Sequence, residues 1–375
     1  MDTLLSLSDA FITIQDPRVD RTKKHKLVDI LIIALCATIC GVEGWEEIEI
    51  FAEEREDWLK GFLDLPNGIP SHDTMYRVFS RINPKEFNQA LLKWTAGFCQ
   101  SVDGKVVAID GKTLRGSFDA ATGKGALHMI SAWVEENSLV LGQVAVESKE
   151  NEVSKIPVLL RMLHVKGAIV TIDAIGCQKE VTRIIREENK ADYVLALKKN
   201  QPNLYSEVVH FFKLAQQSSY FTTDTFETVE KGHGRIEQRM CTCLDVAGQL
   251  DHVAQSWKDI TTVAKIHAIG EIKGKIQEQT RYFISSLPCN ARQIAGAVRT
   301  HWSIENSLHW RLDMTFREDA SRIRKDNAPE NMAILRRLAF SLAKARTPKK
   351  MTVKRARFRM ALNWNFALEH FFANN

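Results

Sequence analysis

Two short apolar runs of the sequence end on an aspartate. The segment KVVAIDG reaches Asp110, and the segment GAIVTIDAIG reaches Asp173. In both, β-branched residues predict a short buried strand, and a small residue follows the acid. An aspartate is common where a strand meets a turn, so each motif alone is weak. Two such carboxylates held close together would repel each other and favour a counter-charge.

The elements after residue 105 decide whether these aspartates meet. Strands are predicted at residues 105–109, 126–134, 138–147, 168–172 and 192–197, and helices at 153–163 and 179–188. The early connections are hairpin-like and the later ones are helical crossovers, which indicates a mixed α/β sheet flanked by helices. We expect a ribonuclease-H-like arrangement. Its first and fourth strands are neighbours, which would place Asp110 and Asp173 together at one edge of the sheet.

A pair of carboxylates at a sheet edge suits a hard divalent cation. Mg²⁺ takes oxygen ligands and typically uses one or two carboxylates together with substrate phosphates. Two unrelated aspartates at strand ends are the alternative interpretation. A third acid at the same place would favour the metal.

Glu305 is the candidate third acid. It lies in residues 291–314, which predict a helix whose apolar residues recur at spacings of four and three. On a regular helix Glu305 falls inside the apolar stripe, where a carboxylate needs a partner. That partner is either a metal shared with the aspartates or a histidine, His301 or His309. Other acids fall at the edge of the stripe or beyond the helix: Asp313, Glu318 and Asp319.

Several longer motifs follow one another along the chain. They read AIDGKTLRGS, TIDAIGCQKE, YVLALKKNQ, GHGRIEQR and HWSIENSLHWRLDMTFREDASRIRKDNAPENMAILRRLA. In this order they resemble the DDE transposases of bacterial insertion sequences, and among these the H-repeat-associated proteins of Rhs elements. The resemblance covers nearly the whole chain. It implies that Asp110, Asp173 and Glu305 bind two Mg²⁺ or Mn²⁺ ions and catalyse DNA strand cleavage and strand transfer.

The residue patterns and the resemblance together give an expected domain organisation. We expect an N-terminal helical domain over residues 1–100, for which DNA contact and a plain scaffold are both open. A ribonuclease-H-like domain follows over 101–345, with a β-rich insertion at 222–287, and residues 346–375 form a basic tail or helix. The expected partners are the ends of the element and the target DNA, bound by a homodimer, with no membrane and no nucleotide cofactor.

Relatives often carry Tyr, Arg and Lys around the Glu, where this chain has Val298, His301 and Leu312. Two alternatives therefore stay open: a DNA-binding remnant that cannot transpose, and a metal-dependent phosphohydrolase.

Cations and amides near these motifs are candidates for contacts with DNA phosphates. The run from Lys344 to Arg359 is also dense in Lys and Arg. For each group the alternative is a solvated surface. The candidates are Lys112, Arg115, Lys198, Lys199, Asn200, Gln201, His233, Arg235, Arg299, His301, Lys349, Lys350, Lys354 and Arg355.

The composition is that of an ordinary globular protein. Of 375 residues, 45% are hydrophobic and 26% are charged, and the net charge of +5 permits a polyanionic partner without requiring one. The seven cysteines lack paired CxxC spacing, so we expect reduced thiols and no zinc site. The apolar run from Leu27 to Cys40 is too short to span a bilayer and predicts a buried helix. We expect a cytoplasmic protein.

Overall fold

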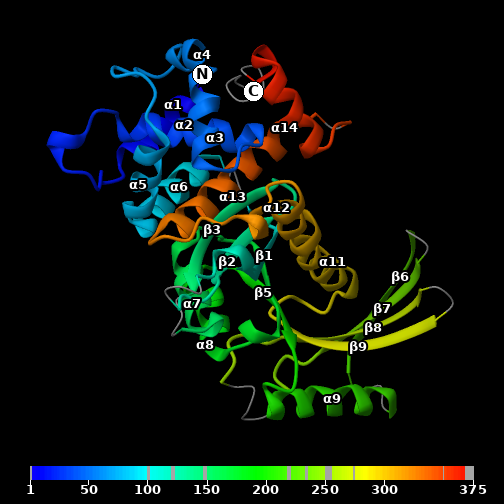
Figure 1. Ribbon diagram of the computed structural model, residues 1–375. Coiled ribbons are helices and arrows are strands. Elements are labelled where there is room, and N and C mark those ends of the chain that lie inside the picture. Colours follow the sequence, from blue (N-terminus) through cyan, green and yellow to red (C-terminus); the bar gives the residue numbers. More distant parts are fainter. Residues whose placement is uncertain are drawn as a thin grey trace. The chain divides into compact units, whose positions relative to one another are not determined.

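The structure is a computed structural model of the 375-residue chain (Figure 1). It describes residues 2–98, 102–119, 123–146, 150–217, 221–232, 235–249, 256–272, 275–348 and 350–367. The chain forms two compact units, each built from separate stretches of sequence. The helical unit contains Met1–Gln100, Gly111–Glu150 and Glu305–Asn375, and the sheet unit contains Ser101–Asp110 and Asn151–Ile304.

Helices make up most of the helical unit. They are α1 (Asp2–Ile12), α2 (Leu27–Cys40), α3 (Trp45–Glu53), α4 (Glu56–Lys60), α5 (His72–Arg81), α6 (Pro84–Phe98), α12 (Trp310–Met314), α13 (Ala328–Arg346) and α14 (Val353–Leu362). Helix α2 is buried along nearly its whole length, as its apolar sequence predicts. Ser71 caps α5 by accepting a hydrogen bond from the Thr74 N–H at 3.4 Å, so this predicted helix start is confirmed.

No single helix in the described part of the chain is long and apolar enough to cross a membrane. The pair α2 and α3 passes such a test only together, with a bend of 97° between them.

An antiparallel hairpin also belongs to the helical unit. Its strands are β2 (Leu127–Val134) and β3 (Leu139–Val146), which pair from His128–Val146 to Val134–Leu139. The hairpin is attached to α13, because Ser341 Oγ accepts a hydrogen bond from the Val140 N–H at 3.2 Å.

The sheet unit contains a large mixed sheet. Its strands lie in the order β1-β4-β5-β9-β8-β7-β6. They are β1 (Val106–Leu114), which continues into the helical unit, β4 (Ile169–Ile172), β5 (Asp192–Leu197), β6 (Thr223–Gly232), β7 (Arg235–Asp245), β8 (Thr262–Ile272) and β9 (Lys275–Ser285). The pairs β1–β4 and β4–β5 are parallel, and the remaining pairs are antiparallel. The predicted mixed α/β sheet is therefore present.

Helices lie on both faces of this sheet (Figure 1). They are α7 (Glu152–Met162), α8 (Lys179–Arg183), α9 (Pro202–Gln217) and α11 (Ala291–Ser303). Helix α11 buries Ile294 and Val298 against strand residues such as Phe283. On the opposite face, Tyr205 and Phe212 of α9 contact the ring of Tyr282, with centroids 5.5 and 5.7 Å apart. The long antiparallel strands are thus held between two helices.

Candidate active site

The register of β1 and β4 places Asp110 and Asp173 at equivalent positions on neighbouring strands. The run Val106–Ile109 pairs residue by residue with Ile169–Ile172 in parallel orientation. In each strand the aspartate is the next residue, and both side chains are half-buried. Asp173 follows the end of β4, as predicted, but β1 continues past Asp110 to Leu114, so the prediction that the first strand stops at residue 109 is wrong. The predicted adjacency of the first and fourth strands is confirmed, and it brings these two acids together.

The turn after β4 orients the carboxylate of Asp173. Its Oδ1 accepts a hydrogen bond from the Ile175 N–H at 3.0 Å and so caps a short helical turn, Ala174–Gly176. Burial raises the pKa of Asp173; the Ile175 N–H opposes this shift, Glu152 adds to it and Lys198 opposes it. A cation beside this carboxylate would therefore offset a real cost of burying its charge.

The segment after β5 supports the same turn. Asn200 Nδ2 donates to the Ala174 carbonyl at 2.7 Å, and Gln201 Nε2 donates to the Cys177 carbonyl at 3.0 Å. These two amides, predicted as phosphate contacts, hold the backbone behind Asp173. The sequence gives no signal for this role, because the partners are backbone atoms of a distant turn.

Two cations stand at the same edge of the sheet. Lys198 and Lys199 are exposed and follow β5, which runs parallel to β4. Because carboxyl ends of parallel strands share an edge, both lysines lie on the side where Asp173 ends its strand.

The helix that carries Glu305 is interrupted. Helix α11 ends at Ser303, a π turn covers Ile304–His309, and α12 follows. Ile304 and Leu308 are buried, whereas Glu305 is exposed. The expectation that Glu305 lies inside a buried stripe is wrong. It assumed one regular α-helix, and a π turn bonded i→i+5 changes which residues face the core.

Glu305 also belongs to a different unit from the aspartates. It is the first residue of the last segment of the helical unit, while Asp110 and Asp173 are in the sheet unit. The register that joins the two aspartates does not include it.

His301 lies on α11, one turn before Glu305. Its Nδ1 is 3.1 Å from the Oγ1 of Thr171, a buried residue of β4. Burial lowers the pKa of His301 to about 4, with Thr171 opposing the shift. The imidazole is therefore neutral at neutral pH, so the predicted contact of His301 with a phosphate has no positive charge to support it.

Lys112 is buried in the helical unit among three carboxylates. Its Nζ lies 2.7 Å from Asp313 Oδ1, 2.9 Å from Asp319 Oδ1 and 3.6 Å from Glu318 Oε2. Burial lowers the pKa of Lys112, but these acids outweigh it and the pKa is raised. We call these four residues the Lys112 cluster. With only 7% of its surface exposed, Lys112 is poorly suited to the DNA contact predicted for it.

A second buried ion pair extends the Lys112 cluster. Glu318 Oε1 accepts a hydrogen bond from Arg337 Nη1 at 2.6 Å, and the two side chains are 0% and 1% exposed. Arg337 Nε also donates to Ser131 Oγ on β2 at 3.1 Å. The backbone is close-packed here too, because a Cβ on Gly116 would lie 2.3 Å from the Ser321 carbonyl oxygen. Charges and backbone together fix the segment that follows α12.

The other predicted DNA contacts differ in their surroundings. The Arg115 side chain is 85% exposed, and its Nε lies 3.6 Å from Asp319 Oδ2. Arg299 Nη2 lies 2.7 Å from Glu230 Oε2, so its charge is matched on the sheet. Arg235 opens β7. His233 and Lys349 lie outside the described residues.

The basic segment near the C-terminus contains a packed helix. In α14 the side chains of Val353, Ala356, Arg357 and Met360 are buried. Arg357 donates to the carbonyls of Thr38 at 2.8 Å and Ile39 at 3.0 Å. On the solvent side Lys354 and Arg355 are exposed, as is Lys350 before the helix. One face of α14 thus belongs to the core and the other offers free cationic surface.

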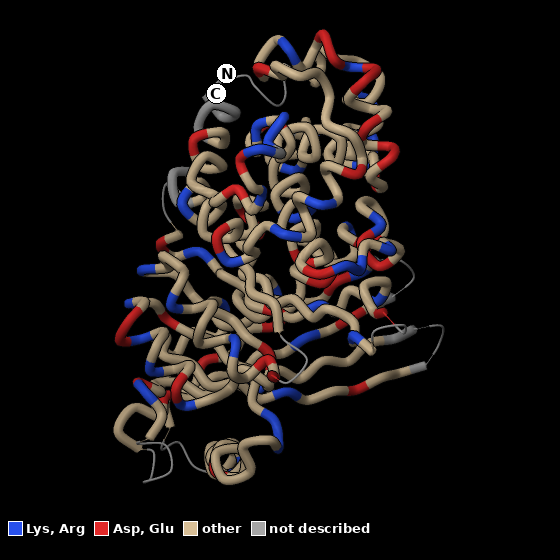
Figure 2. The backbone as a smooth tube through the Cα atoms, turned by 60° about the vertical axis from the view of Figure 1, so that its left-hand side comes forward, with Lys and Arg blue, Asp and Glu red and all other residues tan. Residues whose placement is uncertain are grey.

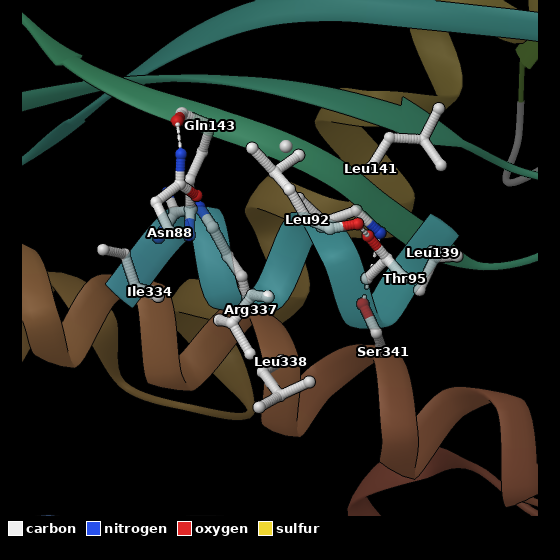
Figure 3. Close-up of a pocket in the computed structure, with 13 residues that line it drawn as sticks. Asn88, Leu92, Thr95, Leu139, Leu141, Gln143, Ile334, Arg337, Leu338 and Ser341 are labelled. Carbon is white, nitrogen blue, oxygen red and sulfur yellow. Dashed lines mark hydrogen bonds between the residues drawn. The ribbon is translucent and has the colours of Figure 1, made fainter. Parts of the chain in front are cut away.

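A small cavity lies within the helical unit, between α6, β3 and α13 (Figure 3). Asn88, Gln143 and Arg337 line it, and Asn88 Nδ2 donates to the Gln143 carbonyl at 2.6 Å. Its volume of about 20 Å³ suits one water molecule. None of the predicted catalytic or DNA-binding residues is among those that line it.

The donor set can be compared with the needs of a divalent ion. Asp110 and Asp173 are hard oxygen donors in adjacent positions, and this pair fits Mg²⁺. Among the described residues, no group of three or more His, Cys, Asp or Glu side chains is gathered to hold a metal. Lys, Arg, Asp and Glu are interspersed along the backbone of both units, in keeping with a net charge of only +5 (Figure 2).

The chain is similar in sequence to known proteins. Residues 102–342 match the family described as "Transposase DDE domain", and residues 8–95 match "DDE_Tnp_1-associated". "Putative transposase YncI" of Escherichia coli O157:H7 is 42% identical over 96% of this chain and 93% of its own length. "H repeat-associated putative transposase YhhI" of Escherichia coli (strain K12) is 40% identical over 90% of each chain.

A shorter relative is named differently. "Inactive transposase YbfQ" of Escherichia coli (strain K12) is 56% identical over 15% of this chain and 68% of its own length. The long matches support a transposase function. They cover the segment from β1 to α13 as well as the preceding helices, and the chain therefore belongs to the transposase DDE domain family.

Proposed function

We propose that this protein is a transposase that cleaves DNA at the ends of a mobile element and joins the freed strand to a target. Asp110, Asp173 and Glu305 are its catalytic acids. The observation that carries the proposal is the parallel register that puts Asp110 beside Asp173. In a DDE-family chain, carboxylates at equivalent positions of two neighbouring strands are best explained as ligands of the ions that act on the phosphodiester.

In this proposal each acid has a defined task. Asp110 and Asp173 hold Mg²⁺ or Mn²⁺, with Glu305 as the third protein ligand and two ions in all. Such ions lower the pKa of an attacking water or 3′-hydroxyl and stabilise the leaving oxygen. The chain itself fixes the Asp173 carboxylate through the Ile175 N–H, and Asn200 and Gln201 hold the turn in place.

Exposed cations supply the contacts with the DNA backbone. At the sheet edge these are Lys198 and Lys199, and in the helical unit they are Arg115, Lys350, Lys354 and Arg355. Lysine and arginine at such positions bind phosphates without reading sequence. Lys112 and His301 are left out of this set, since one is buried among acids and the other is neutral. We also propose the ribonuclease-H-like arrangement and a homodimer on DNA.

The test uses the full-length protein and a DNA fragment that carries the terminal repeats flanking its gene. With Mg²⁺ or Mn²⁺ we expect strand cleavage at defined ends and joining of those ends to a target plasmid. EDTA and Glu305→Gln should both abolish cleavage. Binding without cleavage under any metal would instead identify a remnant. Hydrolysis of a small phosphate ester, with no action on DNA, would favour a phosphohydrolase.

A further inference from the structure

We propose that the Thr171–His301 contact and the Lys112 cluster are positioning contacts that fix the chain on either side of Glu305, each within its own unit. This inference rests on the proposed function, because it assigns these residues a purpose in setting the place of Glu305. No residue of either contact is a proposed metal ligand.

The first contact lies in the sheet unit. Thr171 is two residues before Asp173 on β4, and His301 is one turn before Glu305 on α11. Their Oγ1 and Nδ1 atoms are 3.1 Å apart. Apolar packing already attaches α11 to the sheet, but it is tolerant of small shifts along the helix. A directional hydrogen bond between the buried Thr171 hydroxyl and the His301 ring does not tolerate such shifts, so it defines one position of the helix.

The second contact lies in the helical unit, and it too involves a residue two positions away from a proposed catalytic aspartate. Lys112 is two residues after Asp110 on β1, and Asp313 is on α12, which follows the π turn. The Lys112–Asp313 distance of 2.7 Å is the shortest of the three that its ammonium makes in the cluster. Each contact therefore holds one of the two helices that flank the π turn of Glu305: the first holds α11 before the glutamate, and the second holds α12 after it.

The energetics of the Lys112 cluster favour a positioning role over a purely stabilising one. Burying several charges costs desolvation energy that their attraction only repays when the geometry is good, and apolar residues often stabilise a fold equally well. What the charges add is a specific arrangement. Glu305 has little packing of its own to define it, because it is exposed within the π turn between the two contacts.

The experiment removes each contact beside a matched control in the same unit. Thr171→Val deletes the hydroxyl, and Thr262→Val deletes a buried hydroxyl that donates to the Leu287 carbonyl at 2.7 Å. Lys112→Met deletes the ammonium, and Arg18→Met deletes a cation paired with Asp16 at 2.8 Å. Asp313→Asn is the milder second variant if Lys112→Met does not fold. Thr171→Ser tests rescue.

Two measurements separate positioning from general stability. Hydrogen–deuterium exchange of the metal-free protein reports on residues 304–314 without any activity. The rate of DNA cleavage as a function of Mg²⁺ concentration reports on metal affinity. We expect faster exchange in residues 304–314 for the contact variants only. Their cleavage should slow by about 10-fold to 100-fold and need more Mg²⁺, since a small misplacement of a reacting group has effects of this size.

The outcomes are distinct. Exchange and Mg²⁺ dependence that match those of the controls overturn the positioning role. A Thr171→Ser variant that behaves like Thr171→Val does so too, because the hydroxyl would then be irrelevant. If the wild-type protein cleaves no DNA at all, the proposed function fails, and the exchange data alone decide whether the contacts fix this helix.

Discussion

The two units both bury carboxylates, but they compensate the charge in different ways. In the helical unit Glu318 is fully buried and lies 2.6 Å from Arg337, and its neighbours Asp313 and Asp319 contact Lys112. In the sheet unit Asp173 receives a backbone N–H, and burial raises its pKa. Glu318 is thus matched by a buried guanidinium, whereas Asp173 receives a backbone N–H, which suits Asp173 to a ligand. Burial also raises the pKa of Asp313, in spite of its contact with Lys112.

The largest expected effect is on catalysis. Asp110→Ala and Asp173→Ala should each lower Mg²⁺-dependent cleavage by well over about 100-fold, which is the upper range for residues that merely support a metal ligand. DNA affinity, measured by gel shift, should change little, because the cations remain. Cleavage near the wild-type rate in either variant would show that this aspartate is not a catalytic acid. The proposed metal ligands would then no longer differ in role from the ion-paired acids of the helical unit.

The same chemical change in the two units should have opposite effects on stability. Glu318→Gln leaves Arg337 buried without its counter-charge and should cost about 3–5 kcal/mol of unfolding free energy. Asp173→Asn should leave stability unchanged or slightly higher, since burial already penalises its charge. Urea unfolding of both variants at pH 7 measures this. Equal losses would show that Asp173 is compensated as fully as Glu318.

A third prediction concerns the pH dependence of stability. The pKa of His301 is lowered from 6.5 to about 4, so the unfolded chain takes up a proton first as the pH falls. This contribution is fully present above pH 6.5 and is lost between there and about pH 4, by about 2–3 kcal/mol. His301→Gln should flatten this part of the stability curve. Parallel curves for wild type and variant, from urea unfolding across this range, would count against a buried neutral imidazole.

The smallest effects concern DNA binding, where both units are expected to contribute. Lys198→Ala with Lys199→Ala, and separately Lys354→Ala with Arg355→Ala, should each reduce the slope of log affinity against log salt by about 2. Lys85→Ala, at an exposed position of α6, is the control and should leave the slope unchanged. A pair that behaves like the control would confine the DNA surface to the other unit.

The sequence predicts the site best where the signals are local. The strand of β-branched residues before Asp173 and the turn after it can be recognised within ten residues of sequence. The order of the elements matches an arrangement whose first and fourth strands are neighbours, and β1 and β4 are neighbours in the sheet. The exposure of Glu305 could not be obtained in this way. The apolar periodicity predicts which side of a helix each residue occupies only while the helix is regular. Nothing in the sequence IENSLH indicates the π turn.

Long-range charge pairing is also beyond a reading of the sequence. Lys112 beside Asp110 suggested a DNA contact, but its partners lie about 200 residues later, between Asp313 and Asp319. The basic run near the C-terminus was predicted for its charge alone. Its helical period divides it into buried residues such as Arg357 and exposed ones such as Lys354. Which face meets the core depends on α2, to whose carbonyls Arg357 is bound.

The π turn restricts the length of the chain as well as its composition. A turn bonded i→i+5 accommodates one residue more than the α-helical turn that it replaces. Deleting one residue between Ile304 and His309 would restore a regular helix and rotate everything after it, which would carry Asp313 away from Lys112. The hairpin loops of β6–β9 can gain or lose residues at small cost, as surface loops do. Among homologues, therefore, the spacing from Glu305 to Asp313 should be fixed while those loops vary in length.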